Sequence, residues 1–152
     1  MKHKFLLDEN ILYFAVKGVN TSGAPDCTAT DLVDRIGSNC HRMVIDPELA
    51  GRYAKHLQTL ESVRPPAMEP SRFLNEFLLN SAKAFLEPYK PAQIPQGVKV
   101  PHEDIHIVRL AVQSGALVVT EDIPLREAIN TQPVLGLQAL TSEQALVLAH
   151  EE

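Results

Sequence analysis

The stretch from His102 to Asp122 limits what this chain can fold into, because a helical pattern runs directly into a buried strand. Apolar residues first recur at helical spacing, and Gly115 is a natural stop for that helix. The next run, Leu117 to Val119, is apolar without alternation, which is typical of a parallel strand buried on both faces. The stretch therefore predicts one helix–strand unit of an α/β layer.

The rest of the chain repeats this alternation. We expect a first strand at Phe5 to Leu7, a short helix that stops near Gly18, and a second buried strand at Met43 to Ile45. Further expected elements are a helix after Asp46-Pro47, a long helix from Ser71 to Leu86, a Pro-rich connection over 88–100, an edge strand from Val134 to Leu140 and a last helix capped by Thr141 and Gln144. The predicted fold class is α/β, a single-domain α/β/α sandwich over residues 1–152 with a mostly parallel four- or five-stranded sheet.

Composition sets outer limits on function. The chain has 152 residues, of which 45% are hydrophobic and 22% charged, as expected for one globular domain. Its net charge of −5 gives no bulk basic signal for nucleic acid, but it leaves room for a local basic rim around an acidic pocket. Cys27 and Cys40 are expected to be reduced thiols. The segment MKHKFLLDEN predicts neither a signal peptide nor a membrane anchor, so a cytoplasmic location is expected.

Acidic residues stand at the ends of several predicted elements. Asp8 follows the first strand, Asp104 begins the helix of the opening stretch, and Asp122 follows its strand, while Asp46 and Glu48 begin the helix after the second strand. In a parallel sheet these positions share one edge, where their charges repel one another unless a cation neutralises them. Mg²⁺ or Mn²⁺ suits such an all-oxygen cluster. A single acid at a helix start is often only a cap, so the set as a whole indicates the metal site.

Three segments carry a family resemblance. They are LLDENIL near the start, DIHIVRLAVQSGALVVTED in the middle and GLQALTSEQAL near the end. In this order and spacing they resemble PIN-domain ribonucleases over nearly the whole chain, with Asp8 and Asn10 like the family's D-x-N, and Thr120 and Asp122 like its T-x-D. The resemblance implies a PIN-like fold and Mg²⁺- or Mn²⁺-dependent hydrolysis of RNA phosphodiester bonds by water.

The resemblance also assigns roles to residues. Asp8, Asp104 and Asp122 would hold the metal, and Asn10 and Thr120 would orient those carboxylates. Many members are toxins, so the toxin of a toxin–antitoxin pair is one form of the expected function, with RNA, an antitoxin protein and a second copy of the chain as partners.

Arg52 departs from the family pattern, which has another acid at this position. Glu48, one turn earlier, substitutes as a fourth catalytic acid if its side chain reaches the pocket. The alternative is a surface Glu48–Arg52 pair worth at most about 0.5 kcal/mol. If Arg52 weakens metal binding, the chain is instead a degenerate PIN-like module that binds RNA or protein without cutting it.

A second motif competes for the same residues. His102 to His106 matches HExxH, in which two histidines on one helix face bind Zn²⁺ beside a glutamate base. Pro101 precedes the motif, Asp104 interrupts it, and no clear third ligand follows closely. A zinc protease is thus the minor alternative, and both histidines are expected in solvent or at the pocket rim.

Overall fold

The fold is built on one sheet of five parallel strands. A computed structural model describes residues 2–80, 83–86 and 93–151. The strand order is β3-β2-β1-β4-β5, and each neighbouring pair is parallel. The strands are β1 (Lys4–Leu7), β2 (Arg42–Ile45), β3 (Ala84–Leu86), β4 (Leu117–Val119) and β5 (Ala139–Leu140). The predicted α/β class with a parallel sheet is confirmed.

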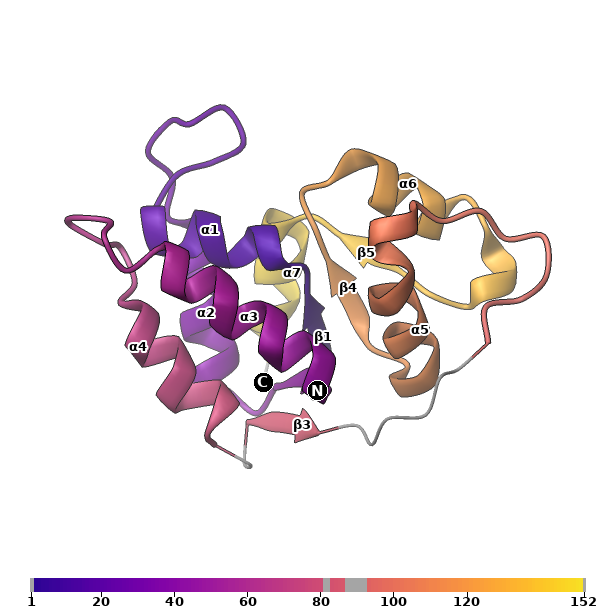
Figure 1. The fold of residues 1–152 in the computed structure, drawn as a ribbon, viewed down its shortest axis with the longest axis horizontal. Helices are drawn as coiled ribbons and strands as arrows, with labels where there is room; N and C mark the ends of the chain where they lie inside the picture. The colour runs from indigo at the N-terminus through magenta and orange to yellow at the C-terminus, as the bar shows by residue number, and fades with distance from the viewer. Residues whose placement is uncertain (1, 81–82, 87–92, 152) are drawn as a thin grey trace.

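Helices flank this sheet. They are α1 (Glu9–Lys17), α2 (Thr28–Ser38), α3 (Pro47–Thr59), α4 (Pro70–Phe73), α5 (Ile105–Ser114), α6 (Ile123–Asn130) and α7 (Ser142–Ala149). Short turns of π-helix (Leu74–Leu78) and 3-10 helix (His102–Asp104 and Pro133–Leu135) complete the list. In Figure 1, α1, α3 and α4 lie at one end of the molecule and α5 and α6 at the other, with β1, β4 and β5 between them. None of the described helices is long and apolar enough to cross a bilayer.

Local chemistry sets the predicted helix ends. The Asp46 carboxylate accepts a hydrogen bond from the Leu49 amide at the start of α3, with Pro47 in the first turn. Gly115 ends α5 with a positive φ of 70°, a conformation that suits glycine. Thr141 and Gln144 form the expected capping box of α7. These caps determine the residue at which each helix begins or ends, and therefore where the acidic residues lie relative to the strands.

Two expected elements were wrong in part. The helix from Ser71 to Leu86 ends at Leu78, because the segment 84–86 pairs with β2 as strand β3. A short apolar run fits either structure, and only the neighbouring strand decides between them. The expected edge strand from Val134 to Leu140 is a strand only at its last two residues and begins as a 3-10 turn. Within the Pro-rich connection, residues 93–100 form no helix or strand, and residues 88–92 lie outside the described part of the chain.

Tyr53 joins α3 to the end of β1. Its side chain is fully buried, and its hydroxyl donates a hydrogen bond to the carbonyl of Leu7, the residue before Asp8. Its ring also packs edge-on against Phe73, with 5.7 Å between centroids. Burial raises the pKa of this phenol well above its ordinary value, so it acts as a neutral donor. Tyr53 therefore helps to hold the backbone that presents Asp8.

Tyr53→Phe should lower the free energy of unfolding by about 1–3 kcal/mol, because it leaves the buried Leu7 carbonyl without this donor. Urea unfolding followed by circular dichroism measures the change. Tyr13→Phe is the matched control, since the Tyr13 hydroxyl only accepts a bond from exposed Lys17 and its loss should cost less than about 0.5 kcal/mol. Equal losses in the two variants would contradict the role given to Tyr53.

Candidate metal centre

The candidate site lies at the carboxyl edge of the sheet, between β1 and β4. The chain runs outward from β1 through β2 to β3, then returns to the other side of β1 as β4 and β5. Ligands of open α/β sheets bind at such a reversal of strand order. Asp8 follows β1 and Asp122 follows β4, while Asp104 begins the helix that leads into β4. Topology thus delivers three carboxylates from three elements to one crevice.

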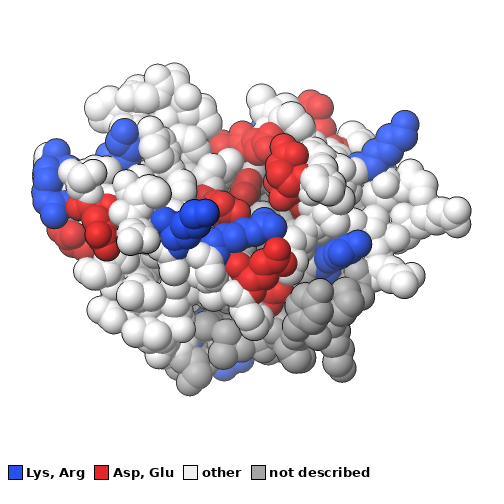
Figure 2. Space-filling view, viewed as in Figure 1, with Lys and Arg blue, Asp and Glu red and all other residues white. Residues whose placement is uncertain are grey.

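The three aspartates meet there. Each of Asp8, Asp104 and Asp122 offers one carboxylate oxygen, and these oxygens all lie within 4.8 Å of one another. Asp8 is 8% exposed and Asp104 is 6% exposed, so two of the carboxylates are largely removed from water. Figure 2 shows Asp and Glu side chains gathered on this face between the two ends of the molecule, with Lys and Arg side chains beside them.

Thr120 connects two of these residues. Its buried hydroxyl donates to Asp8 Oδ2 at 2.7 Å and accepts from the Asp122 amide at 3.0 Å. Asp8 Oδ1 accepts from the Glu9 amide at 2.8 Å, which makes Asp8 the cap of α1. Both oxygens of Asp8 are therefore held in place, and Thr120 has the contacts that an orienting residue needs.

The charges of the cluster are poorly satisfied by the protein itself. Burial raises the pKa of Asp104 to about 6, and the negative charges of Asp8 and Asp122 add to the rise. Burial also raises the pKa of Asp8, although the hydrogen bonds from Thr120 and Glu9 oppose that change. Asp104 Oδ2 is buried and has no hydrogen-bond partner among the described residues. Such a buried carboxylate oxygen is costly unless a cation or a proton satisfies it.

These residues fit a hard divalent cation. All three donors are carboxylates, which suit Mg²⁺ and Mn²⁺. Their oxygens all lie within 4.8 Å of one another, so one cation could be shared by the three side chains. The unpartnered oxygen of Asp104 is an available ligand atom.

Glu48 lies in a separate group beside the three aspartates. Its Oε2 is 2.5 Å from Nδ1 of His106, and its Oε1 is 3.3 Å from the guanidinium of Arg52. Arg52 also lies 3.6 Å from Glu9. The Glu48–Arg52 pair considered from the sequence is present, and Glu48 is not in the cluster of three.

His106 is partly buried, whereas the sequence analysis placed both histidines of the HExxH motif in solvent or at the pocket rim. Its side chain is 15% exposed, and its Nε2 lies 2.7 Å from Asp46 Oδ2 as an ion-pair contact that does not count as a hydrogen bond. His102 is exposed in the 3-10 turn that precedes α5. Neither histidine belongs to the group of potential metal ligands found among the described residues. A catalytic zinc site needs three protein ligands, so the absence of both histidines from this group weighs against a zinc protease.

Two more polar residues lie near the cluster in sequence. Asn10 Oδ1 is buried without a hydrogen-bond partner, and among the described residues its side chain has no bond to the three aspartates. Arg126 on α6 donates to the Thr120 carbonyl at 3.1 Å, which brings a cation next to the site. Sequence analysis did not single out Arg126; the available signal was its position four residues after Asp122 at the start of one helix.

Comparisons with known proteins give a structural likeness but no family. The chain matches no protein-family model and no curated protein. It is similar to the solved structure of a PilT N-terminus domain protein from the hyperthermophilic archaeon Sulfolobus solfataricus P2. The two share 15% sequence identity over 98% of this chain and 95% of the other, with a TM-score of 0.45. At these values the likeness does not assign the chain to a family, so functional inference depends on the residues of the site.

Proposed function

We propose that this protein is a Mg²⁺- or Mn²⁺-dependent ribonuclease that hydrolyses RNA phosphodiester bonds. The observation that carries the proposal is the buried, unpartnered oxygen of Asp104 within a cluster of three carboxylates. Fixed carboxylates at this edge of an α/β sheet suit a cation that in turn binds phosphate. The resemblance of the sequence to PIN-domain ribonucleases makes RNA the expected substrate.

The residues divide the work as follows. Asp8, Asp104 and Asp122 would hold the cation, and Thr120 keeps Asp8 oriented toward it. A bound Mg²⁺ or Mn²⁺ would activate water and stabilise the negative charge that develops on the phosphoryl group. Arg126, held at the Thr120 carbonyl, supplies positive charge that attracts the RNA backbone. Glu48 contributes less directly, because its carboxylate is already paired with His106 and Arg52.

Arg52 bears on the choice between a nuclease and a degenerate binding module. Its guanidinium lies against Glu9 and Glu48. Its charge is thereby directed to these two acids, and the structure records no ion pair between Arg52 and the three aspartates. This favours a functional cation site over a degenerate one.

The proposed biological setting is a toxin of a toxin–antitoxin pair, acting in the cytoplasm as a homodimer. A neighbouring gene for a small DNA-binding protein would support this setting.

Incubation of the purified protein with single-stranded RNA tests the proposal. We expect cleavage with Mg²⁺ or Mn²⁺, none with EDTA, and recovery when Mn²⁺ is restored. The Asp104→Asn protein, prepared in the same way, controls for contaminating nuclease. RNA binding without any cleavage would instead support the degenerate module, and absence of both would overturn the ribonuclease.

A further inference from the structure

A cavity of about 300 Å³ lies beside the metal centre, between the segment 19–28 and the start of α7. Glu121, which lines it, stands between Thr120 and Asp122 at the end of β4, so the wall of the cavity is one residue along the chain from the aspartate cluster. The volume is at the lower end of the range for small-molecule pockets. It suits a group about the size of one nucleoside.

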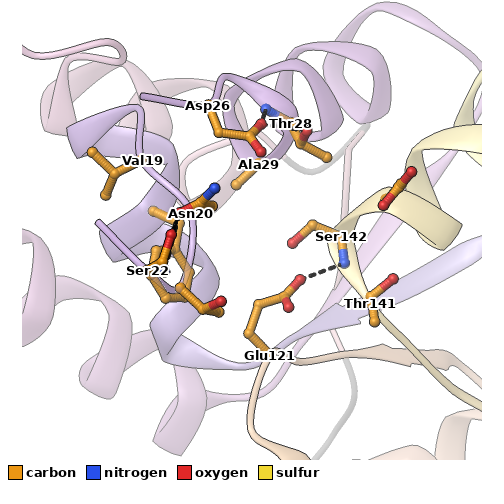
Figure 3. Close-up of a pocket in the computed structure, with 12 residues that line it drawn as sticks. Val19, Asn20, Ser22, Asp26, Thr28, Ala29, Glu121, Thr141 and Ser142 are labelled. Atoms are coloured by element: carbon orange, nitrogen blue, oxygen red, sulfur yellow. Dashed lines mark hydrogen bonds between the residues drawn. The ribbon is translucent and has the colours of Figure 1, made fainter. Parts of the chain in front are cut away.

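Some polar groups that line the cavity are held by hydrogen bonds within the protein, and others have no hydrogen-bond partner. Ser142 is 5% exposed, its Oγ has no hydrogen-bond partner, and Figure 3 shows this oxygen pointing into the cavity. The Ser142 amide donates to Glu121 Oε1 at 2.7 Å, which holds that carboxylate on the wall. Asn20 Oδ1 accepts hydrogen bonds from Ser22 and Ala24, and the side-chain amide of Asn20 also hydrogen-bonds to Asp26. The cavity therefore presents a buried hydroxyl without a partner and a fixed carboxylate.

The charge of the cavity excludes a phosphate and favours N–H donors. Asp26, Glu121 and Glu143 line it, and none of the described residues on its wall is Lys or Arg. Asp26 already accepts hydrogen bonds from Thr28 and Asn20, whereas Glu143 is exposed and has no recorded partner. The ring of Phe14 adds an apolar surface. A flat, neutral group rich in N–H donors matches these walls.

We propose that this cavity is a nucleobase subsite, which takes the base of a nucleotide next to the scissile phosphate and prefers a base with an exocyclic amino group over uracil. The inference rests on the proposed ribonuclease function. Proteins read single-stranded RNA by stacking bases on aromatic rings and by hydrogen bonding to base edges. Carboxylates accept hydrogen bonds from the exocyclic amino groups of guanine, adenine or cytosine. Uracil has no amino group, and its single N3–H donor lies between two carbonyl oxygens that a carboxylate repels.

Two measurements separate this inference from the nuclease itself. The first is the base composition around the cuts made in an RNA of mixed sequence. We expect uracil to be disfavoured roughly fivefold or more at one fixed position, and Ser142→Ala or Glu143→Gln to reduce that bias. Glu127→Gln, an exposed change of the same charge on α6, should keep it. Ser142→Ala should fold normally, because its Oγ makes no hydrogen bond that holds the fold.

The second measurement is the binding of the four ribonucleosides in EDTA, followed by NMR. Guanosine, adenosine or cytidine should bind more tightly than uridine, and Ser142→Ala should weaken that binding. Cleavage without base bias, together with no nucleoside preference, would overturn the subsite and leave the ribonuclease intact. Nucleoside preference without any RNA cleavage would support the subsite while the nuclease proposal failed.

Discussion

Asp104→Asn is expected to stabilise the metal-free protein and to abolish its response to Mn²⁺. The pKa of Asp104 is raised to about 6 in the folded chain, so its ionised form is less favourable there than in the unfolded chain. The folded state is therefore favoured below the ordinary pKa, and that advantage is lost as the pH rises through about 6. Above that pH, a neutral asparagine removes the repulsion, and the melting temperature should rise by about 2–4 °C for each kcal/mol gained.

The same substitution should impair binding and catalysis. Asparagine supplies no anionic oxygen at the position where the unpartnered Oδ2 now lies. Loss of a group that only orients a metal ligand commonly costs about 10–100-fold in affinity or activity, and loss of the ligand itself should cost more. Thermal melts in EDTA measure stability, and melts in excess Mn²⁺ measure the protection that metal binding gives. RNA cleavage measures catalysis.

Asp31→Asn provides the matched control. Asp31 is exposed in the first turn of α2, where a negative charge favours the helix dipole. Its replacement should lower the melting temperature slightly and leave the Mn²⁺ response unchanged. If Asp104→Asn destabilised the metal-free protein, or kept the protection by Mn²⁺, the cation role assigned to Asp104 would be wrong.

The position of the three aspartates at one edge of the sheet could be predicted, because local residue patterns show where strands end and helices begin. Asp8 follows the apolar run of β1, Asp104 precedes the periodic residues of α5, and Asp122 follows the apolar run of β4. A parallel topology then places all three at one edge without further information. Hydrophobic periodicity was sufficient for this part of the site.

Contacts between side chains on different helices and strands could not be predicted from such local patterns. Glu48 lies near the edge as expected, but its contact with His106 depends on how α3 and α5 approach each other and on side-chain conformation. The nucleobase cavity likewise joins residue 20 to residue 142, with no spacing that connects them. Strand β3 was missed for the same reason, because its identity comes from pairing with β2. Tertiary contacts decided what local sequence left open.

Affinity for Mn²⁺ is expected to fall steeply below about pH 6. A carboxylate must lose its proton to bind the metal, and burial holds the pKa of Asp104 at about 6. This residue alone should weaken binding about tenfold for each pH unit below that value, and the raised pKa of Asp8 should steepen the fall. Ordinary aspartates, with a pKa of about 3.9, would give a nearly constant affinity over the same interval. Calorimetric titration with Mn²⁺ at several pH values distinguishes the two profiles.

Thr120 allows the origin of this pH dependence to be tested. Its hydroxyl donates to Asp8 Oδ2 and thereby opposes the rise in the pKa of that carboxyl. Thr120→Val removes the donor with little change in shape, so the pKa of Asp8 should rise further and the fall in Mn²⁺ affinity should begin at a higher pH. Thr120→Ser retains a hydroxyl and should keep the original profile. If the valine and serine variants gave the same profile, the hydroxyl of Thr120 would not be what keeps Asp8 ionised for the cation.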